Sequence, residues 1–178
     1  MRRVIAATLL ACALPAAAGG AQAAPDPTWQ ALAAQSLASL DGGAPAPPPA
    51  LGRPLLLHFW ASWCAPCRRE LPALDAQLGR WLDAGLQLRA VSIDREPEKA
   101  RRFAAELALA MPLLNDGPAG LAKRLDLPAL PCSYLFDGEG RLVVSVLGDD
   151  ERGLARLETA LADLLEPDPP AAAALGTH

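Results

Sequence analysis

The chain contains few of the residues that build metal clusters or cross-linked scaffolds. Its 178 residues include four cysteines and two histidines, and only Cys64 and Cys67 form a closely spaced pair. A zinc site needs four ligands, and the only other soft candidates are His58 and Cys132. Four cysteines are also too few for a structural disulfide framework. We therefore expect a chemical role for the cysteines, and we expect neither a metal nor a cofactor.

The chain also has no excess of positive charge, no internal repeat and no long apolar run. The formal net charge is −4, which gives no reason to expect a nucleic-acid partner. The apolar run near the N-terminus, Val4–Leu14, is shorter than the roughly 20 residues that a membrane-spanning helix needs. A chain of this length suits one domain with extensions.

The residues around this apolar run have the pattern of an export signal. Arg2 and Arg3 precede the run, and Ala21-Gln22-Ala23 provides a small-x-small cleavage site after it. We therefore predict a signal peptide over residues 1–23 and a location in the periplasm.

Cys12 leaves a second possibility open for the N-terminus. The sequence Leu9-Leu10-Ala11-Cys12 resembles a bacterial lipoprotein box, in which the cysteine is acylated, and a lipoprotein or membrane-anchored form would follow. The apolar stretch before Cys12 is short for such a signal. We therefore interpret Cys12 as an apolar member of the signal core.

Composition divides the rest of the chain into three parts. Residues 24–50 are predicted to be an N-terminal arm and an Ala/Pro-rich linker, with a short helix or a loosely packed arm over residues 25–40. A compact domain is expected over residues 51–166, and a disordered tail over residues 167–178.

Apolar patterns predict an α/β domain. The continuous run Leu55–Trp60 indicates a strand that is buried on both faces. Leucines at helical spacing predict a helix from Cys64 to about Asp83, with Pro72 expected to kink it. Strands that alternate with helices and end in a hairpin and a helix indicate a mixed sheet with helices on both faces. The further elements are expected over residues 86–94, 97–107, 111–114, 118–125, 133–136, 141–147 and 154–165.

The segment Trp63-Cys64-Ala65-Pro66-Cys67 lies where the buried strand ends and the helix begins. A thiol at a helix N-terminus meets unpaired N–H groups and the positive end of the helix dipole, and both favour the thiolate. The thiolate is the species that attacks disulfides. We therefore predict that Cys64, on the exposed side of the turn, attacks a disulfide, and that the more buried Cys67 resolves the mixed disulfide.

Residues 55–165 resemble the TlpA/ResA branch of the thioredoxin-like superfamily, which comprises bacterial envelope thiol–disulfide oxidoreductases. The resemblance implies a thioredoxin-like fold, with the central αβ insertion of this branch and a C-terminal β-hairpin plus helix. It is carried by four segments in the expected order: Phe59–Pro72, Val91–Asp94, Leu127–Asp137 and Gly148.

The resemblance also implies roles for residues outside the pair. Pro131 would be a cis-proline that faces the reactive cysteine, and Glu70 would adjust thiol pKa values and proton transfer, although an acid there also suits the helix dipole. His58 stands where thioredoxins carry a buried acid, so it is either a proton carrier or a hydrogen-bonded core histidine. Cys132, where the family usually has a small hydroxyl residue, is expected to be a buried, inert thiol rather than a third exchanging one.

The leading functional hypothesis is a reductase of disulfides in exported proteins, supplied with electrons by a membrane donor of the DsbD type. A role dedicated to cytochrome maturation is not expected, because Cys132 replaces the acidic residue of that branch. A disulfide-donating oxidase of the same fold is the main alternative. A peroxidase of this fold would need a lone cysteine in a Pro/Thr-rich motif at the start of a helix, and the sequence contains no such motif. A copper-binding module is a less favoured alternative, because it would need a CxxxC pair and a distant histidine. The pair here is CxxC, and His178 is the one histidine besides His58.

Overall fold

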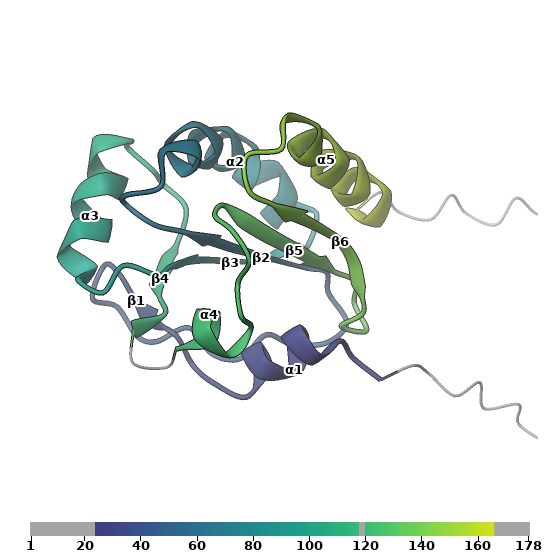
Figure 1. The fold of residues 1–178 in the computed structure, drawn as a ribbon. Helices are drawn as coiled ribbons and strands as arrows, with labels where there is room; N and C mark the ends of the chain where they lie inside the picture. The colour runs from purple at the N-terminus through teal and green to yellow at the C-terminus, as the bar shows by residue number, and fades with distance from the viewer. Residues whose placement is uncertain (1–23, 118–119, 166–178) are drawn as a thin grey trace, which may run out of the picture.

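A computed structural model describes residues 24–117 and 120–165 of the chain (Figure 1). The predicted signal peptide over residues 1–23, with Cys12, and the predicted tail over residues 167–178 lie outside the described residues. Within the described ranges, no helix combines the length and the apolar character needed to cross a membrane.

The centre of the fold is a single mixed sheet of six strands in the order β1-β4-β3-β2-β5-β6. The middle strand β2 is buried at every position, as its continuous apolar run predicts. It pairs in parallel with β3 and antiparallel with β5, while the outer strands extend the sheet on both sides. The strands are β1 (Ala38–Ser39), β2 (Leu55–Trp60), β3 (Gln87–Ser92), β4 (Leu113–Asn115), β5 (Cys132–Phe136) and β6 (Leu142–Leu147).

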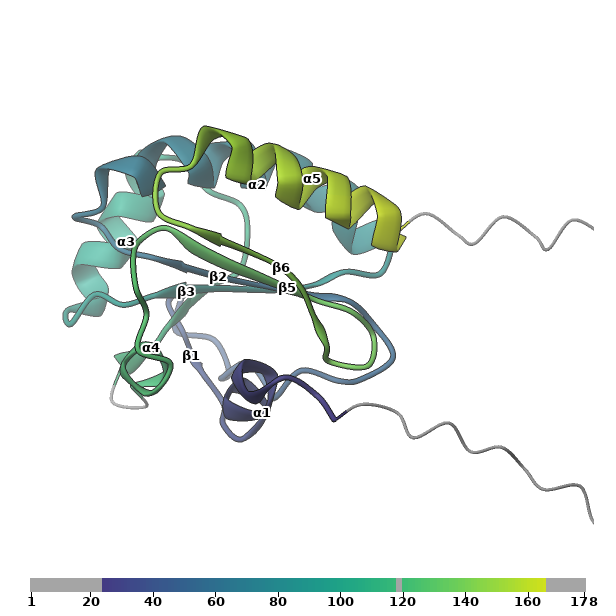
Figure 2. The same cartoon turned by 45° about the vertical axis from the view of Figure 1, so that its right-hand side comes forward.

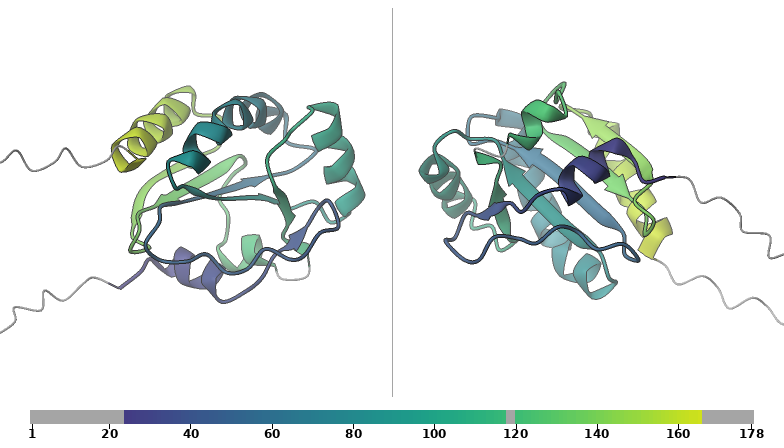
Figure 3. Two further views of the ribbon diagram at one scale, coloured as in Figure 1. Left: turned by 180° about the vertical axis from the view of Figure 1, so that it is seen from behind. Right: turned by 90° about the horizontal axis from the view of Figure 1, so that it is seen from below.

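Helices cover both faces of the sheet, so the predicted layer architecture is confirmed (Figures 1 and 2). One face packs against α2 (Ala65–Asp83), α3 (Pro97–Glu106) and α5 (Glu151–Leu165). The other face packs against α1 (Pro27–Ala33) and α4 (Leu121–Arg124), which lie side by side below the sheet (Figure 3, right panel). The strands therefore separate two apolar cores.

The N-terminal arm is a packed part of the domain rather than a loose one. The helix expected in residues 25–40 is present as α1, and Trp29 and Leu32 of this helix are almost completely buried. The Trp29 ring meets Phe136 of β5 edge to face, with the ring centres 5.6 Å apart. The arm also supplies β1, which the sequence did not predict.

Acidic side chains bind backbone N–H groups next to two short elements. The strand expected over residues 111–114 is present as β4 from Leu113, and the Asp75 carboxylate of α2 accepts from the N–H groups of Ala110 and Met111 just before it. The helix expected over residues 118–125 is present as α4, whose first N–H group donates to the Asp116 carboxylate at 2.6 Å; residues 118 and 119 of that expectation lie outside the described residues.

Helix α2 begins at the carboxyl end of β2 and places the cysteine pair there. Cys64 is the N-cap with an extended backbone, and Pro66 occupies the first turn, where its missing N–H leaves no hydrogen bond unmade. The apolar residues of α2 face the sheet, and Pro72 lies within this helix. The fold thus brings the redox pair to the end of its most buried strand.

Candidate active site

The two cysteines predicted to form the redox pair are joined by a disulfide at the start of α2. The N–H group of Cys67 points at the sulfur of Cys64, with N and Sγ 3.2 Å apart. Cys67 is fully buried, and only 5% of the Cys64 surface is exposed. The order of burial is as predicted. The expectation that Cys64 lies on an exposed side of the turn is wrong, because Cys64 is almost completely buried, whereas the neighbouring Trp63 is 67% exposed.

Cys64 lines an apolar groove of about 480 Å³ that is open to solvent. The groove is formed by the start of α2, the end of β3 and the loop before β5. We call it the Cys64 groove; it is lined by Trp63, Cys64, Ala65, Pro66, Ile93, Leu127, Ala129 and Leu130. The Leu130–Pro131 peptide bond next to this groove is cis, as predicted.

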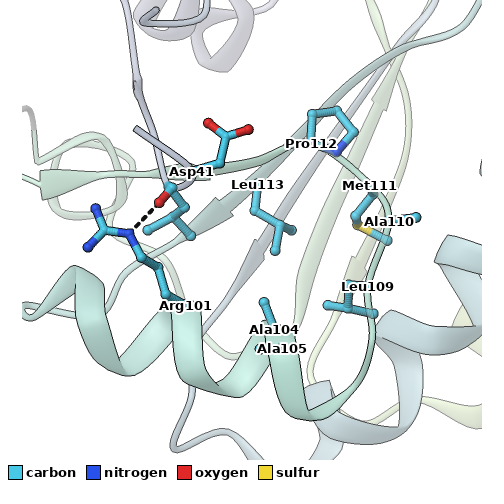
Figure 4. A pocket seen from close by; sticks show the side chains of 10 residues that line it. Asp41, Arg101, Ala104, Ala105, Leu109, Ala110, Met111, Pro112 and Leu113 are labelled. Atoms are coloured by element: carbon cyan, nitrogen blue, oxygen red, sulfur yellow. Dashed lines mark hydrogen bonds between the residues drawn. The ribbon is translucent and has the colours of Figure 1, made fainter. Parts of the chain in front are cut away.

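A second cavity of about 420 Å³ lies between α3 and residues 109–113 (Figure 4). Its lining is apolar apart from Asp41 and Arg101, and the Arg101 side chain donates to the carbonyl oxygen of Leu40. None of its lining residues is a cysteine. Of these two hollows, only the Cys64 groove is lined by a cysteine.

His58 and Glu70 are brought together under the start of α2. His58 lies on β2 and is 1% exposed, and its Nδ1 forms a hydrogen bond of 2.8 Å with Ser133 Oγ of β5. Glu70 Oε1 lies 3.9 Å from the same nitrogen. His58 Nε2 has no hydrogen-bond partner among the described residues. The two residues that the resemblance singled out therefore form one cluster with Ser133, which the sequence did not indicate.

Burial moves the pKa values of these two groups in opposite directions. Burial raises the pKa of Glu70 to about 7, and the negative charge of Asp149 adds to the rise. Burial lowers the pKa of His58 to about 4. At neutral pH His58 is uncharged, whereas Glu70 is close to the midpoint of its titration. Of the two groups, only Glu70 has a pKa near neutral pH.

Asp94 anchors the turn that carries Cys64, a role that the sequence did not reveal. The Asp94 carboxylate is almost completely buried and accepts three hydrogen bonds, all from serines. The N–H and hydroxyl groups of Ser62 donate at 2.8 and 2.7 Å, and the Ser92 hydroxyl donates at 2.8 Å. Ser62 stands two residues before Cys64. Asp94 thus ties the end of β3 to the segment that leads into the redox pair.

Cys132 packs in a different core from the pair. It is buried in the core beneath the sheet, with Phe59 and Phe136, whereas Cys64 and Cys67 belong to the core above it. Burial raises the pKa of the Cys132 thiol and so disfavours the reactive thiolate. This position supports the interpretation of Cys132 as a packed, inert thiol.

The described residues contain no group of three or more His, Cys, Asp or Glu side chains that could hold a metal ion. His58, which a copper site would need, is engaged with Ser133 in the core. His178 lies outside the described residues.

The family model that matches the chain is that of the AhpC/TSA family, and it covers residues 24–145. The chain belongs to the AhpC/TSA family. This match includes the redox pair, Asp94, the cis-proline and most of the sheet.

Curated relatives support the resemblance to the TlpA/ResA branch. The chain is 25% identical over 101 residues to the thiol-disulfide oxidoreductase ResA of Bacillus cereus, which covers 57% of this chain and 58% of that protein. It is 32% identical over 107 residues to the thioredoxin-like protein YneN of Bacillus subtilis, or 59% of this chain and 62% of that one. The chain thus matches less than two thirds of the length of either relative.

A solved structure from Chlorobium tepidum, named as a thiol:disulfide interchange protein of the DsbE kind, has the same fold. It superposes with a TM-score of 0.64 at 24% identity, over 74% of this chain and 92% of that one. The thioredoxin-like fold predicted from the sequence is confirmed.

We predict that Asp94 is a positioning residue for Cys64. In Asp94→Asn one of the two carboxylate oxygens becomes an NH₂ group, which cannot accept a hydrogen bond, so at least one serine donor loses its acceptor. We expect a loss of about 1–3 kcal/mol in the free energy of unfolding, measured with urea on the oxidised protein, and a slower reaction of Cys64 with a disulfide. Ser92→Ala, which keeps the Ser62 anchor, is the control. If Cys64 reacts with a disulfide at the same rate in both variants and in the unaltered protein, Asp94 has a structural role only and does not position Cys64.

We predict that His58 and Glu70 make the free energy of unfolding depend on pH in opposite directions. The pKa of Glu70 is raised in the folded protein, so between about pH 4.5 and 7 the folded state binds more protons at this residue than the unfolded state does. The contribution of Glu70 to the free energy of unfolding therefore falls as the pH rises through this range. Because the folded pKa of His58 is lowered, the unfolded state binds the extra proton between about pH 4 and 6.5, and stability from His58 is lost as the pH falls.

Single variants separate these two slopes. In His58→Asn the unfolding free energy should fall from pH 4.5 to 7, and in Glu70→Gln it should rise from pH 4 to 6.5, each by up to about 3 kcal/mol. Chemical unfolding of the oxidised protein at several pH values measures both. Parallel slopes in the two variants would contradict the prediction.

Proposed function

We propose that this protein is a thiol–disulfide oxidoreductase of the bacterial envelope that reduces disulfides in exported proteins. The observation that carries the proposal is the disulfide between Cys64 and Cys67, at the start of α2 and beside an open apolar groove. The names of the curated relatives support the reaction class. The N-terminal pattern over residues 1–23 supports export.

The reaction follows from the position of the two sulfurs. In the reduced protein the Cys64 thiolate attacks a partner disulfide, so one partner sulfur joins Cys64 and the other leaves as a thiolate that takes up a proton. The Cys67 thiolate then attacks the Cys64 sulfur, which restores the Cys64–Cys67 disulfide and releases the second partner thiol. Two electrons and two protons pass to the partner.

Backbone groups at the start of α2 favour the attacking thiolate. The Cys67 N–H lies 3.2 Å from the Cys64 sulfur, and the positive end of the helix dipole points toward the same atom. The N-terminal position thus lowers the free energy of the charged thiol. Pro66 provides no N–H group, so it adds no further donor.

Glu70 is the proposed proton carrier, and His58 its positioning residue. With a pKa of about 7, Glu70 can give or take a proton at neutral pH, and its carboxylate lies 3.9 Å from His58 Nδ1. His58, with a pKa of about 4, remains neutral through the cycle. Ser133 fixes the orientation of its ring. Pro131 is proposed to support the partner segment that enters the Cys64 groove.

The source of electrons follows from the proposed compartment. An exported reductase works in an oxidising environment, where glutathione and thioredoxin do not keep thiols reduced. Each turnover leaves the Cys64–Cys67 pair oxidised, so a donor must reduce it again. A membrane electron donor of the DsbD type is the proposed partner for this step.

Replacing each cysteine separately tests the proposed reaction. Cys64→Ser should lose all reduction of a disulfide substrate, because it removes the nucleophile. Cys67→Ser should instead accumulate a stable mixed disulfide at Cys64, visible as a mass increase on a non-reducing gel or by mass spectrometry. Cys132→Ser is the control, and it should keep the rate of the unaltered protein. Absence of any adduct with Cys67→Ser would exclude a protein-disulfide substrate.

The reduction potential of the pair decides the direction of electron flow. We expect a value near or below about −250 mV, in the range of thioredoxin, when the protein is equilibrated against a dithiothreitol or glutathione series. A value near about −120 mV, which is typical of a strong periplasmic oxidant, would instead favour the disulfide-donating alternative.

A further inference from the structure

The Cys64 groove adjoins two further hollows on the side of Trp63 that faces α3. It shares Trp63 and Ile93 with a second hollow, whose other lining residues include Arg95 and Lys99. Lys99 in turn lines a third hollow together with Arg68, Arg102 and Phe103. The shared residues place the three hollows in a row from the loop before β5, past Cys64, to α3, and we call this row of hollows the depression.

The two ends of this depression differ in chemistry. The residues of the Cys64 groove carry no charged side chain. The α3 end carries four exposed cationic side chains, which we call the basic rim: Arg68, Arg95, Lys99 and Arg102. An apolar region therefore lies beside the reactive sulfur, and a cationic region begins on the other side of the exposed Trp63.

Exposed carboxylates neutralise only part of the basic rim. Arg68 pairs with Glu106 at 3.1 Å, and its guanidinium also lies 4.5 Å from the centre of the Phe103 ring. Lys99 pairs with Glu96 at 2.7 Å. These are the two exposed acids that line the α3 end.

Arg95 and Arg102 remain available for a partner. Both are exposed, and neither forms a salt bridge with any residue in the described ranges. Among the residues that line these two hollows the one other acid is Asp94, which is buried and accepts from serine donors. Glu98, an exposed acid of α3 outside this lining, pairs with Arg101. A local surplus of exposed positive charge is notable in a chain whose formal net charge is −4.

We propose that the basic rim selects partner segments that carry acidic side chains close to their disulfide. This inference rests on the proposed function and specifies its substrate class. An extended segment with its disulfide at Cys64 would place apolar side chains in the Cys64 groove and carboxylates on Arg95 and Arg102. Guanidinium groups bind carboxylates in a two-pronged geometry, and exposed charges of this kind also speed association.

Matched peptides test the proposal directly. Each peptide has one disulfide and the same apolar neighbours, flanked by three Glu, three Ser or three Lys, on the N-terminal side in one set and on the C-terminal side in the other. The reduced protein is mixed with each peptide, and its oxidation is followed by tryptophan fluorescence. In at least one set we expect the Glu peptide to react about tenfold faster than the Lys peptide at low salt, and the ratio to approach one in 0.5 M salt.

The double variant Arg95→Gln/Arg102→Gln should reduce this ratio to about twofold or less. Arg80→Gln is the matched control, since Arg80 is exposed on the same helix as the cysteines but 15 residues after Ala65, or about 22 Å along the axis. Both variants should keep the unaltered rate of reduction by dithiothreitol in 0.5 M salt, which screens the effect of the rim on the attacking dithiothreitol thiolate. An unaltered rate shows that the cysteine pair itself is intact.

The outcomes separate the two proposals. If no peptide oxidises the reduced protein, the proposed function fails. If all peptides react at one rate, or if the preference for Glu survives in the double variant, only the proposal for the basic rim is overturned.

Discussion

The complete burial of β2 is the constraint on which the rest of the site depends. This strand is hydrogen-bonded to β3 on one edge and β5 on the other, and it is covered by a core on each face. Its carboxyl end therefore has a fixed position, and Cys64 follows only four residues after Trp60. Asp94, at the end of the neighbouring strand, holds the intervening turn at Ser62. The Cys64 sulfur is thus placed by the most buried strand of the sheet.

The same burial determines the proton chemistry. Low exposure disfavours the charged form of every ionisable group, which raises the pKa of a carboxyl and lowers that of an imidazole. Burial therefore favours the uncharged form of both residues, because it raises the pKa of Glu70 and lowers the pKa of His58. A carboxyl group buried beside His58 thus has a pKa near neutral pH, while the imidazole is uncharged there.

Local sequence predicted most of the fold, since β2 and α2 are encoded in apolar periodicity and in the position of the CxxC pair. It did not predict β1, two residues long, because such a strand has too few residues for a recognisable pattern. The low exposure of Cys64 depends on the loop before β5, which lies more than 60 residues away. Ser133 and Asp94 were missed for the same reason. Their partners, His58 and Ser62, are distant in sequence, and serine and aspartate are common in loops.

The position of Cys132 beneath the sheet has a consequence for how the chain tolerates an unpaired thiol. Disulfide exchange requires one sulfur to approach another directly, and the strands stand between Cys132 and the Cys64–Cys67 pair. The sheet therefore separates two kinds of sulfur: two that are joined in a disulfide beside an open groove, and one that fills space in the opposite core. This separation disfavours an incorrect internal pairing of Cys132 with Cys64 or Cys67 in the folded protein.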